Sequence, residues 1–332
     1  MCIALITTQH PEYSLILLNN RDEFLDRPTA PASWWPSPNH EVLGGRDLMR
    51  AEHGTWLGVT RQGRIAVLTN FREKDETSAH AAGGTRSRGG MVNAWLQLAP
   101  ASTETTSMFV ERLCNDAAGL KGVGGFSLVC GQLGRDADGK PRPLAVLSNR
   151  TPDAQAATWI TAASAQVYGL SNSAYDDPWP KVEMGKKLVT EAIAASVESA
   201  EDQAHLIQRL FDVLNTNTLP RRKTGDTFET YLAQLRHSIF VPAITTAVPA
   251  ATARQDRASA PANARVEMLE RADTERAADT SPIYGTQKQT IVLVDHHQHV
   301  TFIERTLFDQ DVAPIPVGQG DRRFDFTVQG TR

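Results

Sequence analysis

The sequence has few cysteines and no long hydrophobic segment, and both absences restrict the classes of protein to which it can belong. Its 332 residues include three cysteines, Cys2, Cys114 and Cys130, which lie far apart and form no CxxC pair. This pattern offers neither a disulfide framework nor a zinc knuckle. No stretch approaches the roughly 18 consecutive apolar residues of a membrane-spanning helix, and the first residues resemble no signal peptide. We therefore expect a soluble, cytoplasmic protein without a membrane span.

An excess of positive charge is also absent. Lys and Arg total 34 against 38 Asp and Glu, which gives a formal net charge of −4 and a sequence pI near 6.2. Without a basic patch the chain lacks the electrostatic footprint of nucleic-acid binding. The phosphate-binding patterns GxxxxGK[ST] and strand-linked GxGxxG do not occur either. We expect no nucleic-acid partner, and the sequence leaves the oligomeric state open.

Short strands joined by turns alternate with helical blocks along the chain. The predicted strands are residues 2–7, 14–18, 55–60, 64–69, 125–131, 144–148, 167–170, 290–294 and 300–304. The predicted helices are residues 91–98, 103–118 and 201–214. Residues 27–38 are rich in proline, and we expect an extended loop there. Hairpins separated by helical blocks favour an α+β fold with largely antiparallel sheets.

One segment does not fit the core. Residues 246–281 consist mainly of Ala, Thr, Pro, Arg and Asp, and their few large apolar residues are Val266, Met268 and Leu269. These cannot offset the entropy cost of ordering the segment. We predict one domain over residues 1–332 with a disordered insertion over 246–281.

Cys2 stands directly after the initiator methionine, at the start of a predicted strand. Removal of Met1 would leave a thiol and a free α-amino group on one residue. The amine has a reference pKa of about 7.7–8.0, so near neutrality part of it is unprotonated and can accept the thiol proton. The alternative is that Cys2 is a small buried hydrophobe, as we expect for Cys114 and Cys130.

A series of short motifs runs in order along nearly the whole chain. The motifs are NNRDEF at 19–24 followed by Arg27-Pro28, GTWLGV at 54–59, TNFR at 69–72, SRG at 87–89, GLSN at 169–172, PWPK at 178–181, YGT at 284–286 and TFIER at 301–305. This series resembles the NRDE family, also called the transport and Golgi organization protein 2 family. This resemblance implies the fold of the N-terminal-nucleophile hydrolases, a four-layer αββα sandwich of two mainly antiparallel sheets.

The resemblance to the bile-salt hydrolase and penicillin V acylase branch also implies roles for five residues. Cys2 would be the nucleophile with its own amine as base, Arg21 would stabilise the thiolate, and Asp22 would hold the amine. Asn70 would be the oxyanion donor, and Asn172 would orient the amine or the substrate. The implied activity is hydrolysis of a non-peptide carbon–nitrogen bond through a Cys2 thioester, with no cofactor and no metal.

This chain departs from the pattern at two places. Arg21 and Asp22 are adjacent, whereas the acylases separate the two, and adjacent residues on a strand point to opposite faces. Only one can then face Cys2 unless a bulge or turn intervenes, and Asn20 or Asp22 is the inward residue if Arg21 faces away. In addition, Gln287 stands where the family has arginine after Tyr-Gly-Thr, and either that contribution is lost or Lys288 replaces it.

Other interpretations remain open at this stage. The resemblance implies roles in Golgi organization, lipid homeostasis and haem movement, as for eukaryotic members of the family. The cleft could therefore carry a hydrophobic cargo such as haem without hydrolysing it. In that case the iron ligand would be Cys2, His10, His53 or His80. An inactive scaffold is a third possibility.

Several further features have a structural and a functional interpretation. Residues 295–299 (DHHQH) suit a hairpin loop better than a metal site. Residues 87–90 (SRGG), before a predicted helix, form a plain connection or an anion site. Four tryptophans are expected to pack over a sheet edge or to line a ligand site, namely Trp34, Trp35, Trp56 and Trp179.

Overall fold

The computed structural model describes residues 2–70, 87–116, 120, 123–164, 166–223, 226, 228–245 and 282–329. The predicted insertion over 246–281 and His80 lie outside these residues. Within the described residues, no helix is long and apolar enough to cross a membrane.

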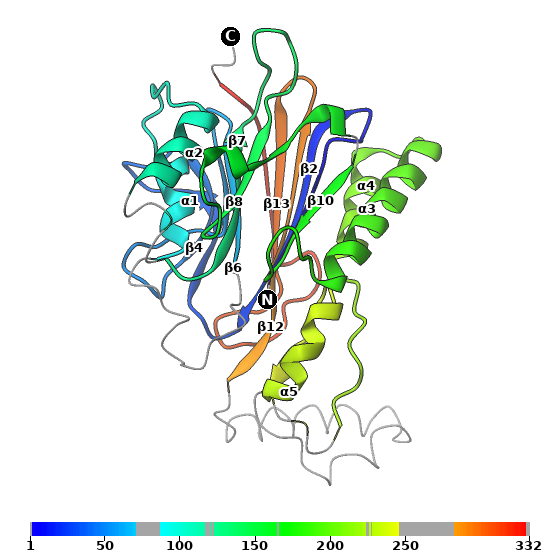
Figure 1. The fold of residues 1–332 in the computed structure, drawn as a ribbon. Helices are drawn as coiled ribbons and strands as arrows, with labels where there is room; N and C mark the ends of the chain where they lie inside the picture. The colour runs from blue at the N-terminus through cyan, green and yellow to red at the C-terminus, as the bar shows by residue number, and fades with distance from the viewer. Residues whose placement is uncertain are drawn as a thin grey trace.

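The strands form two sheets whose pairings are all antiparallel (Figure 1). The first sheet has the order β10 (Val167–Leu170), β1 (Ile3–Thr7), β2 (Tyr13–Phe24), β12 (Ile283–Asp295), β13 (His299–Thr306) and β14 (Asp321–Thr327), with β11 (Ile244–Thr245) paired to β12. The second has the order β3 (Thr29–Trp34), β4 (Val42–Asp47), β5 (Leu57–Thr60), β6 (Arg64–Asn70), β7 (Phe126–Gln132), β8 (Leu144–Ser148) and β9 (Thr158–Ile160).

Helices cover the outer face of each sheet. Helices α1 (Gly89–Leu96) and α2 (Thr106–Asn115) lie on the second sheet, and α3 (Pro180–Glu198) and α4 (Gln203–Leu214) lie on the first (Figure 1). The short helix α5 (Phe228–Leu232) continues into a 3₁₀ turn, and two further 3₁₀ turns span Ala154–Ala156 and Ala162–Ser164. The layer order is therefore αββα, which confirms the predicted fold class.

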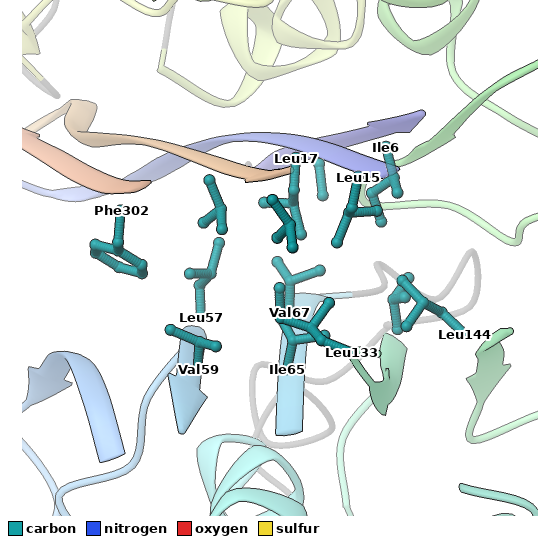
Figure 2. Packing of buried hydrophobic residues seen from close by; sticks show 14 of the residues in the cluster. Ile6, Leu15, Leu17, Leu57, Val59, Ile65, Val67, Leu133, Leu144 and Phe302 are labelled. Carbon is teal, nitrogen blue, oxygen red and sulfur yellow. The ribbon is translucent and has the colours of Figure 1, made fainter. Parts of the chain in front are cut away.

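The two sheets pack face to face through an apolar layer. Leu15 and Leu17 of β2 point toward Leu57 of β5 and Val67 of β6 (Figure 2). The alternation of side chains along each strand separates this layer from two outer layers, which lie under the helices. Ala4 faces the second sheet, for example, whereas the neighbouring Ile3 faces α3 and α4.

Two expectations about local structure were wrong. The proline-rich residues 27–38 are not all loop, since Thr29–Trp34 form β3. This strand is the edge of its sheet and its register shifts between Ala30 and Ser33, so Pro31 removes no essential hydrogen bond. The second predicted strand does not end at Leu18 but continues to Phe24.

Candidate active site

A pocket of about 310 Å³ opens where β1 begins and β6 ends. Its lining is mostly polar and charged, with Trp56, Leu68 and Met49 as the larger apolar side chains. Of the predicted site residues, it brings together Cys2, Arg21, Asp22 and Asn70. The rest of the lining is Glu23, Arg27, Asp47, Arg50, Gly54, Thr55, Ser87, Arg88 and Gly89.

Cys2 is held at this pocket by its main chain. The hydroxyl of Ser171 donates a hydrogen bond to the Cys2 carbonyl oxygen over 2.7 Å. The Cys2 thiol lies 3.9 Å from the main-chain oxygen of Asp22. The residue Cys2 as a whole is 8% exposed to solvent. Cys130, by contrast, is fully buried in the core under α1 and α2, where desolvation raises the pKa of its thiol.

Arg21 and Asp22 occupy opposite faces of β2, as their adjacency in the sequence predicts. In the antiparallel pairing of β1 with β2, Ile3 lies opposite Asn20. The next pair in the same register places Cys2 opposite Arg21. The Arg21 guanidinium lies between the sheets, 4.6 Å from the centre of the Trp56 ring. The Asp22 carboxylate lies on the face covered by α3, where the Thr286 hydroxyl donates to it over 2.7 Å. Both residues nevertheless line the pocket, because they stand near the end of the strand.

A network of side chains fixes the Arg21 guanidinium. Its Nη2 atom lies 3.1 Å from Asp47 Oδ2, and the same carboxylate oxygen accepts a 2.6 Å hydrogen bond from Arg27. Its Nη1 atom donates to the side-chain oxygen of Gln287. The Gln287 amide then donates to the main-chain oxygens of Leu25 and Arg27. Arg21 is thus held in one position at the edge of the pocket.

Gln287 occupies a bulge in β12. The register pairs Thr286 with Asp22 and Lys288 with Arg21, which leaves Gln287 as the extra residue. The bulge directs Gln287 toward Arg21. Lys288 is buried and interacts with Glu304 at 3.4 Å and Thr306 at 2.9 Å, and it does not line the pocket. The Gln287 side chain therefore accepts a hydrogen bond from Arg21, whereas the Lys288 side chain binds Glu304 and Thr306.

Asn70 and Asn172 lie next to each other, but their side chains differ in what they can do. The Asn172 side-chain amide donates to the main-chain oxygen of Asn70 over 2.6 Å, and Asn172 is not part of the pocket lining. The Asn70 side chain lines the pocket and forms no hydrogen bond with any other described residue. Among the described residues, the Asn70 amide therefore has no hydrogen-bond partner, whereas the Asn172 amide supports Asn70.

Two of the other features noted in the sequence also reach the pocket. Trp56 and the segment Ser87–Gly89, which precedes or begins α1, belong to the lining. Trp35 instead donates its ring N–H to the Gly44 oxygen, and Trp34 packs on Phe326. Trp179 precedes α3.

The histidines near the ends of strands do not reach the pocket. His10 follows β1 at the end away from Cys2, and residues 296–298 form the turn between β12 and β13, as predicted for a hairpin. Across the part of the chain that the structure describes, no three His, Cys, Asp or Glu side chains are grouped to hold a metal ion.

Reasoning from the sequence assigned no role to Lys181, Asp47 or Ser171. Lys181 is fully buried, with its Nζ atom 3.7 Å from Asp22 Oδ2. Lys181 belongs to the PWPK motif and Ser171 to the GLSN motif, so these motifs could have indicated a role for both residues. Asp47 lies in β4, a strand that the sequence did not predict because Gly44 and Gly45 disfavour it.

Comparison with known proteins identifies the family. The model of the family described as Transport and Golgi organisation 2 matches residues 1–309, and the chain belongs to this family. The human Transport and Golgi organization protein 2 homolog is 30% identical over 321 residues, which cover 96% of this chain and 94% of the human protein. An uncharacterized protein of Saccharomyces cerevisiae is 26% identical over 99% of this chain and 100% of its own length. The prediction made from the motifs is confirmed.

Solved structures of hydrolases align with the chain at lower similarity. Penicillin V acylase from Agrobacterium tumefaciens aligns with a TM-score of 0.42 and 13% identity, over 93% of this chain and 84% of that one. An N-acylethanolamine-hydrolyzing acid amidase ortholog from Caenorhabditis elegans aligns with a TM-score of 0.34 and 11% identity, over 71% of this chain and 98% of that one.

Proposed function

We propose that the protein is a cysteine amidohydrolase whose mature chain begins at Cys2 and which cleaves a small polar amide. The observation that carries this proposal is that Cys2, Arg21 and Asn70 line one pocket, and that the Asn70 amide bonds to no other described residue. Acyl transfer requires a nucleophile and a hydrogen-bond donor for the oxyanion, and a nearby fixed cation adds further stabilisation of negative charge.

In the acylation step, the α-amine of Cys2 accepts the thiol proton, and the thiolate attacks the amide carbonyl carbon. The resulting oxyanion receives a hydrogen bond from the Asn70 side chain. The carbon–nitrogen bond then breaks, and the α-ammonium returns its proton to the leaving amine. The products of this step are a free amine and an acyl thioester on Cys2.

In the deacylation step, the α-amine takes a proton from water, and the hydroxide attacks the thioester carbon. The carbon–sulfur bond breaks, the thiolate recovers the proton, and the carboxylic acid leaves. Arg21 lies opposite Cys2 and stabilises the thiolate in both steps, because Asp47 and Gln287 hold its guanidinium in place. Asp22 accepts a hydrogen bond from the α-ammonium when it forms.

The dimensions and lining of the pocket indicate the kind of substrate. A volume of about 310 Å³ suits a small molecule. Its polar and charged lining favours a polar amide over an extended hydrophobic cargo such as haem or lipid.

The test is hydrolysis of a panel of small N-acyl amides by the full chain, with Cys2→Ala as the inactive variant and Cys114→Ser as the matched control. We expect turnover that Cys2→Ala abolishes and Cys114→Ser preserves. Absence of turnover, combined with a stoichiometric haem absorption shift that Cys2→Ala abolishes, would instead establish the carrier function.

A further inference from the structure

The hydroxyl group of Thr286 has both of its hydrogen-bonding directions fixed. It accepts a hydrogen bond from the Val241 N–H over 2.9 Å and donates one to Asp22 Oδ1 over 2.7 Å. Thr286 and Val241 are fully buried, and so is the Asp22 side chain. A hydroxyl has a single proton and the Val241 N–H needs an acceptor, so the Thr286 proton is directed to Asp22.

The tripeptide that contains Thr286, Tyr-Gly-Thr at 284–286, builds this arrangement. A Cβ atom at Gly285 would lie 3.2 Å from the main-chain oxygens of both Val241 and Pro242, so the glycine lets this segment approach β12 closely. The Thr286 N–H donates to the Val241 oxygen over 2.8 Å. Val241 therefore holds both the main chain and the side chain of Thr286.

Tyr284 acts on the main chain of Asp22. Its hydroxyl donates to the Asp22 main-chain oxygen over 3.1 Å, and the Cys2 thiol lies 3.9 Å from the same oxygen. In the pairing of β2 with β12, Thr286 lies directly opposite Asp22. Because the sheet and Tyr284 hold the main chain of Asp22, its remaining freedom is rotation of the side chain. The bond from Thr286 restricts that rotation.

Lys181 and Thr286 contribute differently to Asp22. The Lys181 Nζ atom, 3.7 Å from Asp22 Oδ2, supplies a positive charge to a carboxylate that would otherwise be costly to bury. The 2.7 Å bond from Thr286 supplies a direction, because a short hydrogen bond to a carboxylate oxygen depends on its orientation.

We infer that Thr286 is a positioning residue of the proposed hydrolase, whose hydroxyl fixes the Asp22 carboxylate in the orientation that receives the α-ammonium of Cys2. This inference deepens the proposed function and rests on the mature chain beginning at Cys2. Val241 and Gly285 contribute by setting the direction of the Thr286 hydroxyl.

The test measures ionisation of the α-amine and needs no substrate. Full-length chains carry Cys2→Ala, which removes the competing thiol, and trace acetylation by acetic anhydride is followed over pH by the mass of the first peptide. A carboxylate fixed beside an ammonium group raises the pKa of the amine. We expect Thr286→Val, which keeps the shape but loses the hydroxyl, to lower the pH midpoint of acetylation by about half a unit, or about threefold more unprotonated amine below the midpoint.

Two variants separate this effect from a loss of stability. Thr286→Ser keeps the hydroxyl, and we expect it to keep the midpoint. Thr7 is fully buried at the other end of β1, where its hydroxyl accepts from the Gln9 N–H over 3.2 Å and donates to the Gln166 oxygen over 3.4 Å. Thr7→Val loses a comparable pair of bonds, so we expect a lower unfolding free energy and an unchanged midpoint.

Thr286→Ala replaces Thr286→Val where the latter does not fold, because the smaller side chain leaves room for a water molecule at the Val241 N–H. We expect its midpoint to lie below that of Thr286→Ser. A midpoint that does not move in the folded Val or Ala variant, or that moves equally in Thr7→Val, would overturn the inference.

The outcome distinguishes this inference from the proposed function. A first peptide that begins at residue 2 and shows no shift contradicts only the role of Thr286. A shift in a protein that hydrolyses no amide supports the role of Thr286 and contradicts the hydrolase. A first peptide of the unmodified chain that retains Met1 contradicts the proposed function and this inference together.

Discussion

Asn172 donates its side-chain amide to the main-chain oxygen of Asn70 over 2.6 Å and so joins the residues that follow β10 to the end of β6. These two strands belong to different sheets. A second bond nearby, from the Thr69 hydroxyl to the Ser171 oxygen over 2.8 Å, joins the same two segments. Ser171 in turn holds Cys2. The relative position of the proposed nucleophile and oxyanion donor therefore depends on a few hydrogen bonds between the sheets.

Replacement of Asn172 by Ala tests this dependence. The variant leaves the Asn70 oxygen without this donor, and we expect a loss of about 1–3 kcal/mol in unfolding free energy. We expect kcat to decrease and KM to change less, because Asn172 supports Asn70 and does not line the pocket. Urea denaturation and steady-state kinetics measure the two effects.

Asn20→Ala is the matched control for this variant. The Asn20 amide donates to the main-chain oxygens of Leu214 and Ile239 on the helix side of the sheet. We expect a similar loss of stability and little change in kcat. Equal effects of both variants on kcat would contradict a specific role for Asn172.

Asn70→Ala tests the oxyanion role. Removal of an oxyanion donor lowers kcat by roughly 10²–10³-fold in other hydrolases, and we expect a decrease of that order here. The unfolding free energy should change little, because the Asn70 side chain makes no hydrogen bond to the described residues. Stopped assays at saturating amide measure kcat, and an unchanged kcat would remove Asn70 from the mechanism.

The three cysteines should differ in their reaction with iodoacetamide near neutral pH. Cys130 is fully buried and Cys114 is partly buried, and desolvation raises the pKa of both thiols. Their thiolate fractions are therefore small. Cys2 should be labelled first, as followed by peptide mass over time. Equal rates for Cys2 and Cys114 would indicate that Cys2 is a structural thiol.

Acid should destabilise the fold partly through His10. Burial lowers the pKa of this histidine from 6.5, and its Nδ1 atom accepts a 3.1 Å hydrogen bond from the Glu12 N–H. Below pH 6.5 the unfolded chain binds the proton more readily, so this stability is complete above 6.5 and is lost as the pH falls through the lowered folded pKa.

His10→Asn removes the titration but keeps an oxygen that can accept the Glu12 hydrogen bond. We expect its unfolding free energy to fall less than that of the unmodified chain between about pH 7.5 and about pH 5, as measured by urea denaturation. Parallel curves for the two proteins would show that His10 does not contribute.

Strands such as β1, β6 and β8 could be predicted from the sequence, because they are short runs of mainly apolar residues that are buried on both faces of their sheets. Residues 19–22 of β2 could not, since their side chains are polar and are buried only through partners distant in the sequence. Asn19 donates to the Ile3 oxygen and Asn20 to the Leu214 oxygen, for example. Helix α3 was also missed, because its buried positions include Lys181, Gly185 and Ser196.

Some residues of the candidate site could likewise be predicted from the sequence, and others could not. Cys2 could be named from its position after Met1, and Arg21, Asp22 and Asn70 could be named from motifs; all four line one pocket. The roles of Gln287 and Lys181 could not be inferred, because each depends on tertiary geometry. The bulge in β12 turns Gln287 toward Arg21, and the start of α3 places Lys181 against Asp22.

The proposed chemistry requires that Cys2 carries a thiol and a free amine together. Reaction of the purified full chain with 2-cyanobenzothiazole, which condenses with a 1,2-aminothiol and releases ammonia, tests this most directly by peptide mass. We expect a first peptide that begins at Cys2 and carries the thiazoline adduct. A first peptide that retains Met1, or a blocked amine that forms no adduct, would contradict it.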